Sequence, residues 1–291
     1  MSESLSLRLP EWARKGSPLA RGARPLRVIL REGGLHTVCE EARCPNLGEC
    51  FSRGTATFML LGDRCTRRCG YCSISTARPV PLDPDEPRRV ARAAARMGLR
   101  YVVLTSVNRD DLEDGGAAHF AATIHEVRRI LPGAGVEVLT PDFGGDHRAL
   151  ATVLEAAPSV FNHNIETVPR LFPGLRPQGR YARSLEVLAT ARSLRPGQVT
   201  KSGLMVGLGE SDEEILAVLS DLRRADVDVL TLGQYLRPTR DHAPVKRYVS
   251  PDGFRALEAR ARSLGFPTVY AGVFVRSSFH AEEVFRGGEG R

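Results

Sequence analysis

The chain has 291 residues, which is enough for one large α/β domain with short appendages or for two small domains. Its hydrophobic fraction of 42% and charged fraction of 26% are those of an ordinary globular protein and exclude a disordered chain. The formal net charge of +7 would attract acidic partners, but no run of basic residues with interleaved aromatics marks a nucleic-acid-binding face. A solvated basic surface is the simpler interpretation.

No apolar stretch of the sequence reaches the roughly 18 residues that a membrane span requires. The segment from Met1 to Pro10 also lacks the apolar centre of a signal peptide. We therefore expect a cytoplasmic protein that binds neither membrane nor nucleic acid.

All six cysteines lie between Cys39 and Cys72. In a reducing compartment, thiols held this close in sequence are more often metal ligands or redox centres than disulfides. The first three, which we call the first trio, are Cys39, Cys44 and Cys50 in the spacing C-x4-C-x5-C. Zinc usually takes four protein ligands from C-x2-C pairs, whereas three thiolates suit a cubane iron–sulfur cluster with one iron left open.

A strand is predicted from Thr57 to Gly62, and the remaining cysteines follow it on a loop. This second trio is Cys65, Cys69 and Cys72, with Tyr71 directly before the last thiol. The spacing C-x3-C-x2-C and the aromatic residue resemble the radical S-adenosylmethionine (SAM) signature, in which the open iron binds the amino and carboxylate end of SAM. Tyr71 is then expected near the adenine. A zinc site or a disulfide framework is the alternative, which the compartment and the spacing disfavour.

Beyond the cysteines, β-prone runs alternate with helical patterns roughly every 30 to 35 residues, which is typical of βα units in a parallel sheet. The further predicted strands are 101–107, 136–140, 160–165, 203–208 and 229–232, and the predicted helices are 85–97, 116–130, 146–156, 182–194, 211–224 and 251–264. Six βα units with right-handed crossovers predict an α/β fold, a partial (β/α)6 TIM-like barrel rather than a closed eight-stranded one. An N-terminal cluster-binding extension and a C-terminal segment complete it.

Polar side chains gather just after the predicted strands. They are Thr105, Ser106, Asn108, Arg109, Asp110, Asp142, Asn162, Asn164, Glu166 and Gln234. Ligands bind at this edge of parallel α/β folds, so we expect these residues to share one mouth with the second trio. Asn164 and Glu166 are the predicted cofactor contacts among them.

The segment from Gly203 to Glu210 resembles the G-x-I-x-G-x-x-E segment that lies along adenine in radical SAM enzymes. It predicts cofactor contacts at Gly203, Met205 and Gly207, although glycines near a strand end can equally serve a turn. Three other features have simpler interpretations. Asp111 and Asp114 could bind substrate, but helix capping explains at least one of them. His163 faces either the mouth or the core, and the core is the safer interpretation.

Longer segments resemble the lipoyl synthase family. The first trio lies in Leu35 to Cys50, which is similar to the auxiliary-cluster motif of that family. The other similar segments are Thr105 to Val107, Arg109 to Leu112, Phe161 to Leu171, Gly233 to Arg240 and Arg276 to Ala281. The resemblance thus runs from Gly34 to Ala281, nearly the whole chain.

The resemblance implies a set of cluster ligands. Cys65, Cys69 and Cys72 would hold the catalytic [4Fe-4S] cluster, and Cys39, Cys44, Cys50 and Ser278 the auxiliary one. From the residues alone, Ser278 would be taken for a surface loop. A serine alkoxide is a hard ligand with a more labile bond to iron than a thiolate, which suits a cluster that is dismantled. Phe279 stands where the family usually has Tyr, so any hydrogen bond made by that phenol is lost here.

The resemblance also implies a mechanism. The reduced catalytic cluster would split SAM into methionine and a 5′-deoxyadenosyl radical, which removes hydrogen from C6 of an octanoyl chain on a carrier lysine. The carbon radical would take sulfur from the auxiliary cluster, and a second cycle at C8 would complete the dithiolane precursor. The cofactors perform the difficult chemistry, while the protein supplies binding, orientation and exclusion of water.

Partners and segment roles follow from the same resemblance. The expected partners are octanoylated lipoyl carrier domains or the glycine-cleavage carrier protein, an electron donor such as ferredoxin or flavodoxin, and an iron–sulfur carrier protein. The charge of +7 would assist encounters with acidic carriers. Residues 1–52 would form the extension with the auxiliary-cluster cysteines, 53–267 the radical SAM barrel, and 268–291 a segment closing over the auxiliary cluster.

Two rival functions remain open at this point. Another sulfur-inserting radical enzyme, of methylthiotransferase or biotin-synthase type, would carry its second set of ligands elsewhere, and the former usually adds an RNA-binding domain. A non-catalytic iron–sulfur sensor would not need a strand mouth full of polar groups.

Overall fold

The computed structural model describes residues 8–14, 23–41, 44, 46–52, 56–278 and 281. Phe279 lies outside the described residues, so the consequence of its lost hydroxyl stays a prediction. Within the described chain no helix is both long and apolar enough to cross a bilayer.

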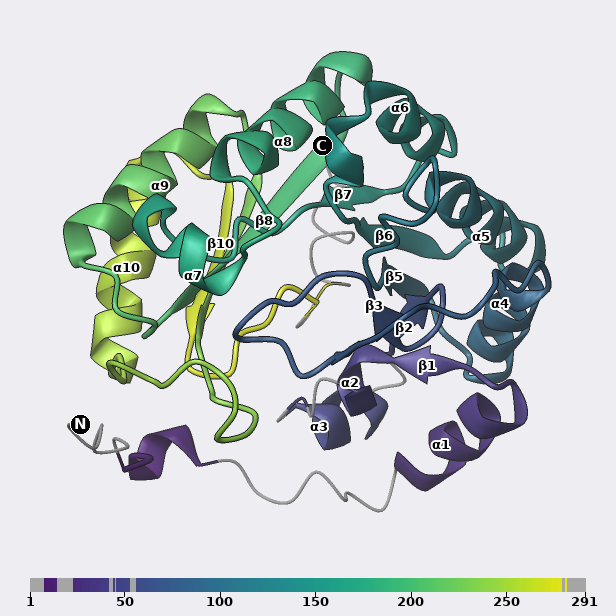
Figure 1. Cartoon of the computed structure of the whole chain (residues 1–291), viewed down its shortest axis with the longest axis horizontal. Coiled ribbons are helices and arrows are strands. Elements are labelled where there is room, and N and C mark those ends of the chain that lie inside the picture. Colours follow the sequence, from purple (N-terminus) through teal and green to yellow (C-terminus); the bar gives the residue numbers. More distant parts are fainter. Residues whose placement is uncertain are drawn as a thin grey trace.

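The molecule is built around one curved sheet of eight strands, with helices packed on its outer face (Figure 1). In sheet order the strands are β1 (His36–Thr37), β2 (Thr57–Leu60), β5 (Tyr101–Ser106), β6 (Gly135–Leu139), β7 (Val160–Asn162), β8 (Val199–Val206), β9 (Val229–Gln234) and β10 (Thr268–Gly272). Only β1 pairs antiparallel, and the seven strands from β2 to β10 are parallel. β3 (Arg64–Cys65) and β4 (Ser75–Thr76) form a separate small ladder at the cysteine loop.

Six longer helices follow the first six parallel strands in turn. They are α4 (Glu86–Arg96), α5 (Ala117–Ile130), α6 (His147–Glu155), α8 (Tyr181–Leu194), α9 (Asp212–Arg224) and α10 (Pro251–Ser263). The shorter elements are α1 (Ala23–Glu32), α2 (Val38–Glu41), α3 (Leu47–Ser52), α7 (Phe172–Leu175), η1 (Glu11–Ala13), η2 (Phe143–Gly145) and η3 (Pro169–Leu171). The six predicted βα units and the partial barrel are therefore confirmed.

Local sequence signals explain where several helices begin. Ser211 and Glu214 form a capping box at α9, because each side chain accepts a hydrogen bond from the other residue's backbone N–H. Ser250 caps α10 through the Gly253 N–H, and Pro251 occupies the first turn, where its missing N–H is harmless.

The sequence analysis missed the strand β10. Of its five residues only Val269 is fully buried, so it lacks the apolar run that revealed the other strands. It nevertheless pairs with β9 along its whole length. The predicted start of β8 was also too late, because Lys201 and its polar neighbours hide a buried strand.

Lys201 is fully buried inside the barrel, where its Nζ pairs with both carboxylate oxygens of Glu137 at 3.0 and 3.1 Å. Tyr101 and Asn162 also donate to Glu137, each at 3.1 Å. Because Lys201 and Glu137 have these partners, a charged residue can occupy the interior face of a strand.

The C-terminal segment after β10 turns into the lumen of the sheet (Figure 1). It crosses β9 at Gly233, where a Cβ atom would stand 2.2 Å from the Val275 carbonyl oxygen. Ala281 then packs against Tyr101 and Val103 on β5. The segment therefore spans the barrel interior, and Gly233 permits its close approach to the sheet.

We predict that Gly233→Ala destabilises the protein by about 1–3 kcal/mol, because the added methyl group forces the backbone of the C-terminal segment away from β9. Urea unfolding followed by circular dichroism measures the change. Gly133→Ala is the matched control, since nothing lies within 4 Å of its Cβ position. Equal midpoints for the two variants would contradict the predicted close approach.

Candidate active site

A cavity of about 500 Å³ opens at the carboxyl ends of the strands. All six cysteines line it, together with Ser278. Parallel pairing places the ends of β2 to β10 on one edge of the sheet, so loops distant in sequence meet there. The predicted convergence is confirmed in part. Six of the ten strand-end polar residues line this cavity with the second trio, namely Thr105, Ser106, Asn108, Asn164, Glu166 and Gln234. The other four, Arg109, Asp110, Asp142 and Asn162, are not among the lining residues.

The first trio comes from the short helices α2 and α3 and the segment between them, and it lies against the C-terminal segment. Asn46 donates from Nδ2 to the Phe274 carbonyl oxygen at 2.6 Å, a contact across 228 residues. Arg276 lines the same cavity, where burial lowers the pKa of its guanidinium and the nearby Cys44 opposes this. Ser278 follows two residues later, so the segment presents it to the cavity that holds this trio.

The second trio is fixed by hydrogen bonds from its own loop and from two other loops. Cys65 Sγ accepts backbone N–H groups of Arg67 and Asn108 at 3.4 and 3.3 Å. The Cys72 carbonyl oxygen accepts from Nε2 of His242 at 2.9 Å, so the neutral ring must carry its proton on that nitrogen. Nδ1 of His242 in turn lies 2.8 Å from the Thr239 hydroxyl, which donates to it.

Burial dominates the acidity of Cys39 and Cys72. It raises the pKa of Cys39 to about 12, and the nearby Cys44 adds to the effect. Burial likewise raises the pKa of Cys72 to about 12, against a hydrogen bond from the Ile74 backbone. These thiols are protonated at neutral pH without metal. Since iron binds the thiolate, metal binding must release protons.

Asn164, Glu166 and Met205 line one wall of the cavity. Asn164 Nδ2 donates to Glu166 Oε1 at 3.1 Å, and the buried Oδ1 of Asn164 has no protein partner. Glu166 has a positive φ of 68° and bridges to β8, a strained conformation for a non-glycine residue. Burial raises the pKa of Glu166, although Arg176 and Asn164 oppose it.

Gly203 and Gly207 are not among the residues that line the cavity. A Cβ at Gly203 would stand 2.8 Å from the Asn164 oxygen, so this glycine makes room for the Asn164 side chain. Gly207 has φ 104° and lies under the Gln234 amide, and Glu210 accepts the N–H groups of Gly207 and Leu208. The two glycines shape the wall, and contact of a cofactor with them stays a prediction.

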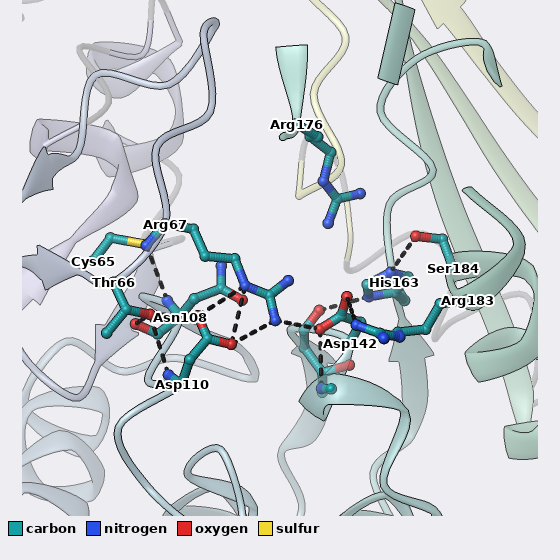
Figure 2. Close-up of polar contacts among 12 residues, drawn as sticks. Cys65, Thr66, Arg67, Asn108, Asp110, Asp142, His163, Arg176, Arg183 and Ser184 are labelled. Carbon is teal, nitrogen blue, oxygen red and sulfur yellow. Dashed lines mark hydrogen bonds and ion pairs between the residues drawn. The ribbon is translucent and has the colours of Figure 1, made fainter. Parts of the chain in front are cut away.

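Tyr71 and Arg176 stand together in the cavity. Burial raises the pKa of Tyr71 well above its ordinary value, and the nearby Glu166 adds to this. Arg176 donates to the Asn164 carbonyl at 3.3 Å and stacks over the Phe172 ring at 5.3 Å. Figure 2 shows its guanidinium pointing toward the Arg67 network, and the residue is buried. Arg176 was not predicted from the sequence, because it lies in an irregular loop between two helices.

Arg67 lies between the first two cysteines of the second trio, and its side chain is 6% exposed. The guanidinium lies between Asp110 and Asp142 (Figure 2). Its Nε and Nη2 atoms donate to the Asp110 carboxylate, and Nη2 also donates to Asp142 at 2.7 Å. Burial would raise the pKa of Asp142, but the hydrogen bond and charge of Arg67 lower it to about 2. Arg183 lies on the other side of Asp142 at 3.6 Å.

Asp111 and Asp114 have structural partners rather than places in the cavity wall. Asp111 pairs with Arg109 at 2.9 Å, and Asp114 accepts the N–H groups of Gly116 and Ala118 at the start of α5. The capping interpretation of Asp114 is therefore confirmed. Arg170 pairs with Glu214 on the surface, away from the cavity.

Comparison with known proteins decides the family. A profile described as the N-terminal domain of lipoyl synthase matches residues 1–44, and one for the Radical SAM superfamily matches residues 59–222. A lipoyl synthase of Rubrobacter xylanophilus is 57% identical over 94% of this chain and 85% of its own length. A lipoyl synthase of Nitratidesulfovibrio vulgaris is 54% identical over 98% of this chain and 95% of its own length. The chain belongs to the lipoyl synthase family.

Solved structures agree on the fold. A crystal structure of HydG, a maturase of the [FeFe]-hydrogenase, has a TM-score of 0.59 at 16% identity, covering 72% of this chain and 50% of that one. Streptococcus suis SuiB bound to S-adenosylmethionine has a TM-score of 0.57 at 12% identity, covering 78% and 52%. At such identities the likeness concerns the fold alone.

As a lipoyl synthase, the chain is a sulfur-inserting enzyme of the radical SAM superfamily that uses SAM and [4Fe-4S] clusters. The methylthiotransferase, biotin-synthase and sensor interpretations are thereby set aside. The cavity fits these cofactors: three thiols per trio line it, and the buried Oδ1 of Asn164 and Nη1 of Arg67 await polar partners. No three His, Cys, Asp or Glu side chains of the described residues form a site for a single metal ion.

The His163 side chain is buried, and the residue also lines the cavity, so the core and mouth interpretations both apply. Its Nδ1 donates to the Thr140 carbonyl at 2.9 Å, and its Nε2 accepts from the Ser184 hydroxyl at 3.1 Å. This pattern requires a neutral ring. Burial, aided by the charge of Arg176, lowers the pKa of His163 to about 4.

His163 predicts a pH dependence of stability. The unfolded ring binds a proton near pH 6.5 and the folded ring only near pH 4, so stability is lost as the pH falls through this window. When the pH is lowered from 7 to 5, the free energy of unfolding of the native protein should fall by about 2 kcal/mol more than that of the His163→Gln variant. Urea unfolding at both pH values measures the difference, and parallel losses in both proteins would contradict the neutral buried ring.

Proposed function

We propose that this lipoyl synthase uses Cys65, Cys69 and Cys72 to hold the cluster that binds SAM. Cys39, Cys44, Cys50 and Ser278 hold the auxiliary cluster. The enzyme inserts two sulfur atoms at C6 and C8 of a protein-bound N6-octanoyl-lysine. When bound, the first cluster supplies the electron that splits SAM and the auxiliary cluster supplies the sulfur.

One observation supports this assignment above all. The six thiols and Ser278 share one cavity, although more than 200 residues separate the cysteines from the serine in sequence. Atoms that must meet during sulfur insertion can do so only if both sets of ligands face a common space. The Asn46 contact to Phe274 and the crossing at Gly233 hold the serine-bearing segment beside the first trio.

The cavity wall supplies binding and orientation for SAM. Tyr71 and Met205 offer apolar contact for the adenine, and the free amide oxygen of Asn164 accepts a hydrogen bond. Glu166 pairs with the amino group or ribose of the cofactor. Arg176 is the cation best placed for the SAM carboxylate, because its guanidinium lines the cavity with one weak backbone bond. Gly203 and Gly207 act by shaping this wall.

Partners and segment roles extend the proposal. Octanoylated lipoyl carrier domains or the glycine-cleavage carrier protein present the substrate, ferredoxin or flavodoxin donates electrons, and an iron–sulfur carrier protein delivers iron–sulfur units. The site of action is the cytoplasm. Residues 1–52 carry the auxiliary-cluster cysteines, 53–267 the radical SAM barrel and 268–291 the closing segment, whose first five residues also add β10 to the sheet.

The proposed ligand sets predict that variants of the two trios differ in SAM cleavage and in sulfur insertion. In Cys39→Ala/Cys44→Ala, reductant and SAM should still release 5′-deoxyadenosine with octanoylated peptide, but lipoyl product should fall to background because the sulfur source is lost. Cys65→Ala should lose both outputs. Mass spectrometry of peptide and nucleoside measures them, and lipoyl product from the double variant would refute the sulfur-donor assignment.

A further inference from the structure

Cys65 Sγ receives its two backbone hydrogen bonds from different parts of the chain. One donor, the Arg67 N–H at 3.4 Å, lies in the cysteine loop after β2. The other, the Asn108 N–H at 3.3 Å, lies in the loop after β5. The Arg67 bond depends on the shape of the cysteine loop itself, whereas the Asn108 bond persists only if the two loops keep a fixed separation.

The side chain of Arg67 joins the same two loops. Its Nε and Nη2 atoms bond the Asp110 carboxylate at 2.6 to 3.1 Å, in a fork that fixes direction as well as distance. Thr66 reinforces the joint, since its hydroxyl donates to Asp110 Oδ2 at 2.6 Å and accepts the Asp110 N–H at 3.1 Å. Figure 2 shows this joint directly beside Cys65.

A second anchor holds Arg67 from the far side. Asp142, with a fully buried side chain after β6, accepts from Nη2 at 2.7 Å and is itself held by the Gly144 N–H at 3.1 Å. Buried ion pairs contribute little net stability compared with apolar packing, so stability alone is a weak reason for this arrangement. The forked hydrogen bonds of Arg67 instead fix the position of the loop that carries the thiols.

We propose that Arg67 is a positioning residue that holds the Arg67 and Asn108 N–H groups on Cys65 Sγ and thereby sets the reduction potential of the cluster at the second trio. The inference rests on the proposed assignment of Cys65, Cys69 and Cys72. Hydrogen bonds to the sulfur ligands of an iron–sulfur cluster stabilise its electron-rich, reduced state. Without the fork the two N–H groups drift, and the cluster becomes harder to reduce.

The test is an anaerobic redox titration of the reconstituted full chain followed by electron paramagnetic resonance. The signal that changes shape on addition of SAM identifies the cluster at the second trio. In Arg67→Gln its potential should fall, so that at a fixed reductant potential the ratio of reduced to oxidised cluster drops about fivefold, the equivalent of one net hydrogen bond. Arg67→Lys should shift in the same direction, because an ammonium keeps the charge but cannot form the fork.

Arg68→Gln is the matched control, because it removes the same charge from an exposed neighbour in the same loop. Its potential should equal that of the native protein. If Arg67→Gln does not fold, Asp110→Asn breaks the same joint from the other side and should shift the potential with the same sign.

The outcomes are distinct. A native potential in Arg67→Gln or Asp110→Asn, or a native potential restored by Arg67→Lys, overturns the positioning role while leaving the cluster assignment intact. Absence of any SAM-responsive signal in the native protein means that the proposed function itself has failed.

Discussion

The parallel pairing of the strands from β2 to β10 is the constraint on which the rest of the structure depends. It places every strand's carboxyl end on one edge, so that loops from all over the chain meet in one cavity. The sheet does not close on itself in the described chain, since β1 and β10 are its two edges. The C-terminal segment enters the lumen of this open sheet and brings Ser278 to the cavity.

Three arginines of the cavity differ in their partners. Arg67 is neutralised by Asp110 and Asp142, whereas Arg176 and Arg276 bond mainly backbone carbonyls. The paired cation holds protein segments together. The two others line the cavity, where a charge acts strongly because water screens poorly.

Sequence alone predicted most of the fold because six βα units leave a strong periodic pattern. The sequence did not predict β10, which is mostly half-buried, or the start of β8, which carries polar side chains such as Lys201. The cysteine ligands were predictable because thiol spacing is a local property. Arg67, Arg176 and the role of Gly233 were not, since their importance arises from contacts between loops that only the folded chain brings together.

The central claim is that two separate sets of ligands in one cavity each hold a four-iron cluster. Iron and acid-labile sulfide analysis of the anaerobically reconstituted chain, with Mössbauer spectroscopy to identify the cluster type, tests it most directly. The account predicts about eight iron and about eight sulfide atoms per chain, all in cubane clusters. An iron and sulfide content of only about four atoms each per chain, or zinc in place of iron, would contradict it.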